Sequence, residues 1–213
     1  MKTPNYQLYL VTDEKLDEQR LCHVIEQSVC GGVSIIQLRE KHQNTRQFIR
    51  KASAVKDLLK SMEIPLIIND RIDVALAVNA DGVHLGQSDM PVDIARKILG
   101  PDKIIGLSVE SHEQLIFANH LDIDYIGLSA IYNTATKTDI RFEWKQEGLE
   151  WAIQHTQHPI VAIGGINQET LPAIAKIGVD GVAIVSAICQ SENPKKAASE
   201  LLAAFHSSQY VPA

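Results

Sequence analysis

Cysteine is scarce in this sequence, and its three occurrences form no pattern. Cys22, Cys30 and Cys189 are odd in number, and no two of them form a C-x-x-C pair. A disulfide framework needs an even set of cysteines and a structural zinc site needs closely spaced pairs, so we expect neither. The scarcity is typical of proteins of a reducing compartment, and we expect the chain to be cytoplasmic.

Long apolar runs and a basic excess are also missing. No segment reaches the roughly 18 apolar residues of a membrane-spanning helix. Asp13 and Glu14 interrupt the amino-terminal apolar run before a signal-peptide core could form. The 26 acidic residues outnumber the 20 lysines and arginines, whereas nucleic-acid-binding proteins usually carry a basic surface. We therefore expect neither membrane nor nucleic acid as a partner, while a small anionic substrate stays open.

Short apolar segments alternate with longer amphipathic ones along the whole chain. In one of the longer segments Phe48, Ala52, Val55, Leu59 and Met62 recur every three or four residues, which predicts an amphipathic helix. The short segments are often apolar throughout, as in strands buried on both faces. We predict eight strands, at residues 7–12, 34–38, 66–68, 82–85, 104–107, 125–128, 160–163 and 181–185.

This alternation predicts a single (β/α)8 barrel, the TIM barrel, as one domain spanning residues 1–213. Gly100 and Gly178 fall where helices should end, and Asn193 before Pro194 should begin the last helix. An open doubly wound sheet is the alternative. The first predicted strand, however, ends in VTDEK rather than in the G-x-G-x-x-G of a dinucleotide-binding fold.

The carboxyl ends of barrel strands carry the active site, so polar residues after each predicted strand matter most. After the second strand, alternation places Gln37, Arg39 and Lys41 on one side. Isolated charges in such a loop are usually solvated. At a barrel rim, however, arginine can bind a diphosphate through paired hydrogen bonds and lysine can bind it as a point charge. The barrel context favours this second interpretation.

Two carboxylates follow the third and fourth strands. Asp70 and Asp89 could together hold Mg²⁺, which takes one or two protein carboxylates and completes its shell with water and phosphate oxygens. The alternative is that each aspartate is the N-cap of the next helix. Their positions on adjacent strands favour the metal site.

His84 and Ser108 lie at the ends of the fourth and fifth strands. A histidine within an apolar run is more often packed or hydrogen-bonded than a general base, although proton transfer stays open. Ser108 lacks the G-x-S-x-G pattern of an activated nucleophile. We expect Ser108 to donate or accept a hydrogen bond.

The remaining strand ends offer phosphate-binding groups. Residues 129–146 form a connection longer than the usual limit of about 12 to 15 residues. Its hydroxyls and ammonium, from Thr134, Thr136 and Lys137, could surround a phosphate or could be ordinary polar surface. Gly164 and Gly165, with the stretch Val185–Ser186, end the last two strands, where many barrels bind phosphate through backbone N–H groups. A tight turn without a ligand is the alternative there.

These motifs together resemble the thiamine phosphate synthase family, which includes a thiazole tautomerase branch. The resemblance covers nearly the whole chain. It rests on YLVTD at 9–13, QLREK at 37–41, IIND at 67–70, GVHLGQSDMP at 82–91, GLS at 106–108, TATKTD at 134–139, AIGGI at 162–166 and VSAI at 185–188.

The resemblance implies a transferase of thiamine biosynthesis. Such an enzyme joins hydroxymethylpyrimidine diphosphate to thiazole phosphate with Mg²⁺, releasing pyrophosphate. By motif, the pyrimidine diphosphate would contact Gln37, Arg39, Lys41, Asn69, Ser108 and Lys137, of which Arg39, Lys41, Ser108 and Lys137 would be catalytic. Asp70 and Asp89 would hold the metal. The thiazole phosphate would contact Thr134, Thr136, Gly165, Val185 and Ser186.

One segment departs from the family pattern. Residues 129–133 read SAIYN, where the family usually has a glycine and two prolines, and we expect this change to loosen the turn beside the thiazole site. The departure keeps two alternatives open, a thiazole tautomerase and a non-catalytic binder of phosphate ligands. The sequence leaves the oligomeric state open and is compatible with a homo-oligomer.

Overall fold

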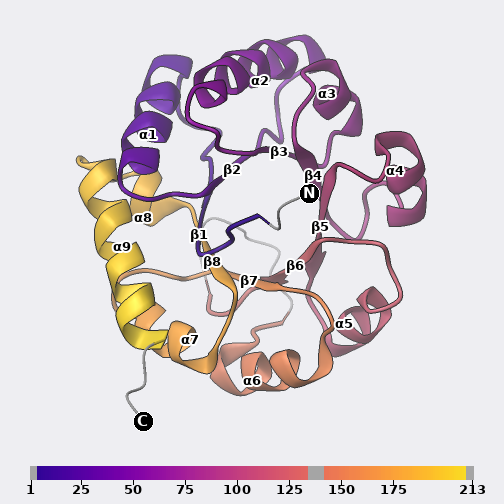
Figure 1. The fold of residues 1–213 in the computed structure, drawn as a ribbon, viewed down its shortest axis with the longest axis vertical. Helices are drawn as coiled ribbons and strands as arrows, with labels where there is room; N and C mark the ends of the chain where they lie inside the picture. Colours follow the sequence, from indigo (N-terminus) through magenta and orange to yellow (C-terminus); the bar gives the residue numbers. More distant parts are fainter. Residues whose placement is uncertain (1–3, 134–141, 210–213) are drawn as a thin grey trace.

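The structure, a computed structural model, describes residues 4–133 and 142–209. Eight parallel strands close into a barrel in sequence order, and helices surround it on the outside (Figure 1). The strands are β1 Leu8–Val11, β2 Ile35–Leu38, β3 Leu66–Asn69, β4 Gly82–Leu85, β5 Ile104–Val109, β6 Tyr125–Ser129, β7 Ile160–Ile163 and β8 Gly181–Ile184. The predicted (β/α)8 barrel is confirmed.

The helices of the described residues alternate with these strands, and two helices follow β8. They are α1 Glu18–Cys30, α2 Thr45–Lys60, α3 Ile72–Ala77, α4 Val92–Leu99, α5 His112–Ala118, α6 Lys145–His155, α7 Leu171–Ile177, α8 Ser186–Cys189 and α9 Pro194–Gln209. None of them is long and apolar enough to cross a membrane.

Two apolar clusters hold the barrel together, because neighbouring residues of a strand point to opposite faces. The larger cluster fills the layer between strands and helices, where Leu8 and Leu10 meet helical residues such as Phe48. The smaller cluster contains the alternate strand residues, among them Tyr9 and Tyr125, and lies inside the barrel. The interior is therefore packed with side chains, as in other barrels of this size.

Three helix ends expected from the sequence, at Gly100, Gly178 and Asn193, agree with the structure. Gly178 is left-handed after α7, and Gly100 follows α4 with a φ of 82°. The Asn193 side chain accepts a hydrogen bond from the Lys196 N–H at 3.0 Å, as an N-cap should. The prediction for α2 was too long, because the helix ends at Lys60 and Met62 lies beyond it.

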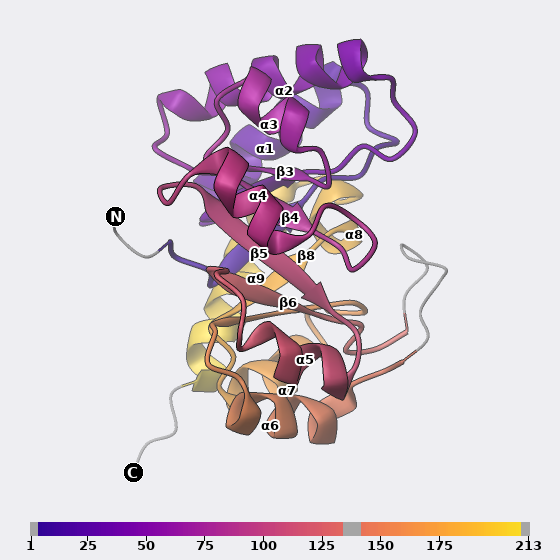
Figure 2. The same ribbon diagram turned by 90° about the vertical axis from the view of Figure 1, so that its right-hand side faces the viewer.

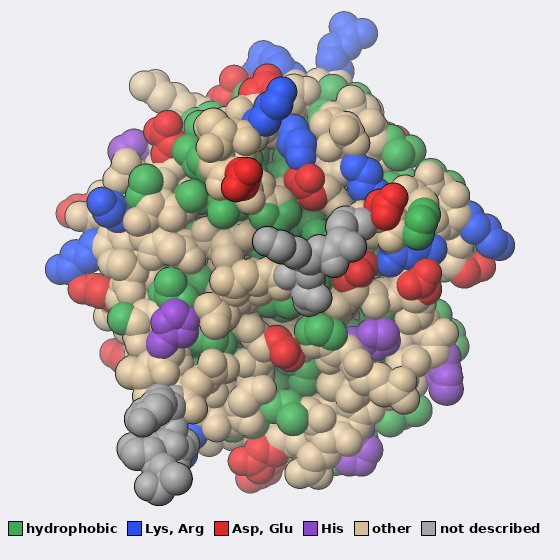
Figure 3. Space-filling view, in the orientation of Figure 1, with side chains coloured by type: hydrophobic (Ala, Val, Ile, Leu, Met, Phe, Trp, Pro, Cys, Tyr) green, Lys and Arg blue, Asp and Glu red, His purple; other side chains and the backbone are tan. Residues whose placement is uncertain are grey.

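The two ends of the barrel differ. Figure 2 shows the barrel from the side, with β5 running toward the end that carries the loops after the strands. Figure 3 shows the opposite end, where side chains of both charges are mixed. Ion pairs brace that amino-terminal side of the strands: Asp81, just before β4, pairs with Lys56 at 2.6 Å, and Asp124, just before β6, pairs with Arg96 at 2.9 Å.

Candidate active site

A chain of hydrogen bonds crosses the inside of the barrel from Gln37 to Ser108. Gln37 Nε2 donates to Tyr9 Oη at 3.0 Å, and the Tyr9 and Tyr125 hydroxyls lie 2.8 Å apart. His84 Nδ1 lies 2.9 Å from Tyr125 Oη, and its Nε2 lies 2.9 Å from Ser108 Oγ. Burial raises the pKa of both tyrosines, so they enter the chain as neutral hydroxyls. The chain joins two residues expected to bind the pyrimidine.

Two glycines make room for this chain. A Cβ atom on Gly106 would overlap the Tyr125 ring, and one on Gly127 would lie 2.8 Å from His84 Cε1. His84 is buried and hydrogen-bonded on both ring nitrogens. This matches the first of the two interpretations of His84, a packed and hydrogen-bonded residue.

The loop after β2 presents cations at the carboxyl end of the barrel. Lys41 Nζ forms an ion pair with the Asp70 carboxylate across the end of β3. The Arg39 guanidinium pairs with no carboxylate of the described residues. The backbone is anchored on the loop after β1: Thr12 Oγ1 accepts from the Arg39 N–H at 3.0 Å, and Glu14 Oε2 accepts from the Lys41 N–H at 2.9 Å. Arg39 is therefore available for an anion.

Asp70 and Asp89 lie close enough to influence each other. Burial raises the pKa of Asp89, and the neighbouring Asp70 raises it further, while a hydrogen bond from the Gly86 N–H at 2.7 Å opposes the change. Neither aspartate caps a helix, because α3 begins after Arg71 and α4 after Pro91, both without a side-chain cap. The N-cap alternative is wrong for both aspartates.

This pair of carboxylates fits Mg²⁺. No group of three or more histidine, cysteine or acidic side chains suitable for a metal occurs in residues 4–133 and 142–209. Mg²⁺ does not require one, since it commonly takes one or two carboxylates and leaves its other positions to water and phosphate. Burial is the main reason for the raised pKa of Asp89, and the charge of Asp70 adds to it, while Lys41 lowers it. A divalent cation would compensate the two negative charges.

Asn69, at the end of β3, has a buried donor without a partner. The residue is 6% exposed, and its Nδ2 atom makes no hydrogen bond. An unsatisfied buried donor costs about 1 to 3 kcal/mol, so such groups in native proteins usually serve a ligand or an ordered water. Asn69 precedes Asp70 directly. The position of this free donor is consistent with the substrate contact expected for Asn69.

The glycines after β7 approach another protein segment. Gly164 and Gly165 have φ angles of 104° and 66°, a region that other residues rarely adopt. A Cβ atom on Gly164 would lie 2.8 Å from Ala130 Cβ, and one on Gly165 would lie 2.9 Å from the Asn133 carbonyl oxygen. From the sequence we expect glycine here because a phosphate approaches the backbone closely. The structure gives another reason, which is close contact with the segment after β6. Val185 is the N-cap of α8, which begins at Ser186.

The segment that departs from the family pattern is firmly held. The Tyr132 N–H donates to the Gly164 carbonyl at 3.1 Å, and the Ile131 N–H donates to that of Ile163 at 3.0 Å. Trp144 also contacts this segment, because its backbone N–H donates to the Ala130 carbonyl at 2.9 Å. Residues 130–132 are therefore tied to β7 and to the start of α6, and a looser turn than that of the family stays a prediction. Thr134, Thr136 and Lys137 lie outside the described residues.

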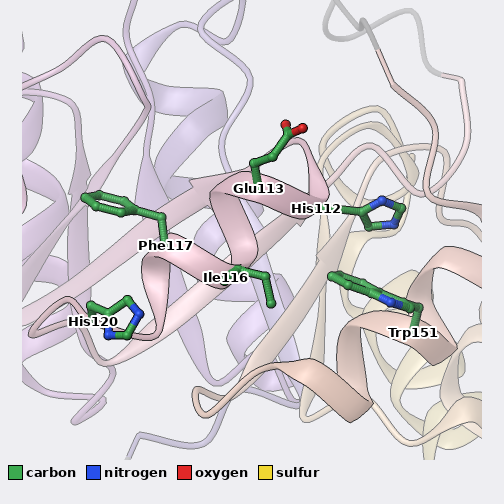
Figure 4. A pocket seen from close by; sticks show the side chains of 6 residues that line it. All are labelled: His112, Glu113, Ile116, Phe117, His120 and Trp151. Atoms are coloured by element: carbon green, nitrogen blue, oxygen red, sulfur yellow. The ribbon is translucent and has the colours of Figure 1, made fainter.

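A hollow of about 460 Å³ lies outside the barrel, between α5 and α6 (Figure 4). Its walls are mainly Ile116, Phe117 and Trp151, with His112 and His120 at its edges. None of the expected site residues lines it. The hollow is therefore separate from the candidate active site.

Known proteins resemble this chain over most of its length. It is 58% identical to a thiamine-phosphate synthase of Vibrio parahaemolyticus, over 92% of this chain and 97% of the relative. It is 45% identical to one of Methanobrevibacter smithii, over 96% and 98%. Among solved structures, a thiamine phosphate pyrophosphorylase from Pyrococcus furiosus superposes with a TM-score of 0.88 at 35% identity, covering 97% of this chain and 98% of that one.

A family model described as thiamine monophosphate synthase matches residues 8–188, the stretch from β1 to α8. This stretch contains every strand of the barrel and every expected site residue. The chain belongs to the thiamine monophosphate synthase family.

Proposed function

We propose that the protein is a thiamine-phosphate synthase, which joins hydroxymethylpyrimidine diphosphate to thiazole phosphate and releases pyrophosphate. One observation carries this proposal: cations follow β2 and carboxylates follow β3 and β4, at the same end of the barrel. Lys41 is paired with Asp70, Arg39 is available, and Asp89 lies beside Asp70. A diphosphate bound with Mg²⁺ needs both kinds of group together.

The pyrimidine end of the substrate would lie deepest. Gln37 and Ser108 flank the barrel interior and are joined by the tyrosine and histidine hydrogen bonds, which fix both side chains. The unpaired Nδ2 of Asn69 would donate to the substrate between them and the metal. In this arrangement the ring is oriented by hydrogen bonds and the diphosphate by charges.

Catalysis would consist of charge stabilisation and positioning. A 4-aminopyrimidine stabilises a cation on its exocyclic methylene, so the diphosphate can leave first and the thiazole nitrogen can then attack. Arg39, Lys41 and Lys137 would neutralise the leaving diphosphate. Asp70 and Asp89 would hold Mg²⁺, whose charge would assist the same departure. No protein nucleophile is required, because the thiazole nitrogen attacks the cation directly.

The thiazole phosphate would bind on the other side of the rim. The backbone of Gly165 and of Val185–Ser186 would donate N–H groups to it, with the hydroxyls of Thr134 and Thr136. Holding the thiazole there places it opposite the diphosphate, so that attack and departure occur on opposite sides of the methylene. All these residues belong to one chain, so a homo-oligomer is compatible with the site but not required. We place the reaction in the cytoplasm.

The test is a pyrophosphate-release assay with both substrates and Mg²⁺. We expect release only when hydroxymethylpyrimidine diphosphate, thiazole phosphate and Mg²⁺ are all present, with thiamine phosphate formed in equal amount. Folded protein that releases no pyrophosphate at saturating substrates would contradict the proposal. Metal-independent isomerisation of a thiazole carboxylate phosphate would instead indicate a tautomerase, and ligand binding without turnover would indicate a regulator.

A further inference from the structure

The loop after β2 contains a residue that faces away from the candidate site. Between Arg39 and Lys41, the Glu40 side chain is 1% exposed, and its Oε1 atom lies 2.6 Å from Lys51 Nζ. Lys51 belongs to α2 and is itself only 7% exposed in its side chain. The alternation that sends the two cations to the rim therefore sends Glu40 into the layer between strands and helices.

The Lys51 ammonium connects three parts of the chain. Besides Glu40, Nζ donates to the Leu16 carbonyl of the loop after β1 at 3.3 Å. That same loop also receives the backbone N–H groups of Arg39 and Lys41, through the side chains of Thr12 and Glu14. Residues 39 and 41 are thus anchored through their backbone N–H groups, and Glu40 between them is anchored through its ion pair with Lys51. The β2 loop has little freedom to rotate while this pair is intact.

Stability alone does not account for such a buried pair. Removing two charges from water costs several kcal/mol per ion, and apolar pairs of similar volume are often equally or more stable. Here the compensation is incomplete, since Glu40 Oε2 is buried without a hydrogen-bond partner. Burial raises the pKa of Glu40, while Lys51 opposes this change. Lys51 therefore helps to keep Glu40 charged in an apolar place.

We propose that the Lys51–Glu40 ion pair is a positioning device for the diphosphate-binding cations. By fixing Glu40 in the layer behind the loop, Lys51 sets the direction in which Arg39 and Lys41 leave the backbone. The inference rests on the proposed function, because it assigns these two cations to the diphosphate. Partners that orient ligand-binding side chains from behind commonly contribute 10- to 100-fold to affinity or activity. Lys51 is a positioning residue and touches no substrate.

The decisive variant replaces the pair with apolar side chains, Lys51→Met together with Glu40→Leu. This change leaves no buried unpaired charge, so we expect the melting temperature to stay equal or rise. We expect KM for the pyrimidine diphosphate to rise roughly 10-fold or more. KM for thiazole phosphate should stay within about twofold, because that phosphate binds elsewhere on the rim. A structural role alone would lower the melting temperature or raise both KM values together.

Two further variants complete the test. Lys51→Arg keeps a cation within reach of Glu40 and should retain KM for the diphosphate within about threefold of wild type. Lys56→Met is the matched control on the same helix, since Lys56 pairs with Asp81 at 2.6 Å near the opposite end of the barrel. It should leave both KM values unchanged. An equal rise in KM for Lys56→Met would contradict the positioning role.

Binding of inorganic pyrophosphate with Mg²⁺, measured by calorimetry, separates this inference from the proposed function. Weaker pyrophosphate binding in the double variant, with Lys56→Met unaffected, supports the positioning role even if the wild type turns nothing over. A wild type that makes thiamine phosphate, and a folded double variant that matches it in diphosphate KM and pyrophosphate affinity, would overturn the inference and leave the function standing.

Discussion

The two sides of the rim present different groups to a ligand. The side formed by β2, β3 and β4 uses charged side chains, with Lys41 paired to Asp70 and Asp89 close by. The side formed by β7 and β8 uses backbone, with Gly164 and Gly165 in left-handed conformations and α8 beginning at Ser186. A charged side can stabilise a departing group whose charge changes, whereas a backbone side holds a phosphate that remains intact. The proposed reaction needs one side of each kind.

The largest effect is expected on the charged side, from Asp89→Ala. Loss of this carboxylate removes half of the proposed metal site and also the acceptor of the Gly86 N–H. We expect kcat to fall by about 1000-fold or more, as when a preorganised charge-stabilising group is lost. Asp93→Ala, an exposed residue in the first turn of α4, is the control and should keep full activity. Activity of Asp89→Ala near that of the control would remove Asp89 from the metal site.

Gly165→Ala should weaken thiazole phosphate binding on the side of the rim formed by β7 and β8. The alanine would have to adopt a φ of +66°, and its Cβ atom would lie 2.7 Å from Tyr132 Cβ. We expect KM for thiazole phosphate to rise roughly 100-fold, because a shift of about 1 Å at a positioned group can have that effect. Gly100→Ala, with a φ of +82° and nothing within 4 Å, is the control for backbone strain alone. If KM for the diphosphate rose equally, the two sides would not be independent.

Thr136→Ala should weaken the same side less. One hydrogen bond to a charged phosphate is worth about 1.5 to 3 kcal/mol, so KM for thiazole phosphate should rise about 10-fold or more with little change in kcat. Steady-state kinetics with the pyrimidine diphosphate at saturation measure this. Thr136→Ser, which keeps the hydroxyl, is the control. A fall in kcat comparable to that of Asp89→Ala would argue against separate roles for the two sides.

The smallest effect on activity is expected from Tyr125→Phe, which interrupts the hydrogen bonds inside the barrel. Tyr9 and His84 would each lose a partner, with a stability loss of about 1 to 3 kcal/mol and a fewfold lower kcat from poorer placement of Ser108. Tyr6→Phe is the matched control, because its hydroxyl makes only a 3.5 Å contact, with the Asp124 carbonyl. Equal melting temperatures for the two variants would show that the Tyr125 hydroxyl contributes nothing.

The charged side was the easier one to predict from the sequence. Arg39, Lys41, Asp70 and Asp89 follow the largely apolar strands β2, β3 and β4 within a few residues, so strand direction alone brings them to one rim. The strands themselves were predictable for the same reason, since residues buried on both faces form continuous apolar runs. Local patterns of this kind carry information about direction and periodicity.

Contacts between distant residues could not be predicted in this way. Tyr9 and Tyr125 are 116 residues apart, and nothing near either one indicates the other. The same holds for Lys51, whose place in α2 resembles that of an ordinary helix-surface lysine until Glu40 is seen behind it. The anchoring of residues 129–133 by Trp144 was missed because it depends on which segments meet in space. These contacts are set by packing of the whole barrel.

The packed interior also limits the route by which ligands can reach the candidate site. Tyr6, Tyr9 and Tyr125 pack together inside the barrel, so side chains fill its interior in the part of the chain that the structure describes. Figure 3 shows the face at the amino-terminal end of the strands. Under the proposed function both substrates would enter, and both products would leave, at the end of the barrel that carries the loops after the strands. Because the proposed position of the pyrimidine is the deeper one, we expect the pyrimidine diphosphate to bind before the thiazole phosphate, an order of binding that the chemistry alone would not impose.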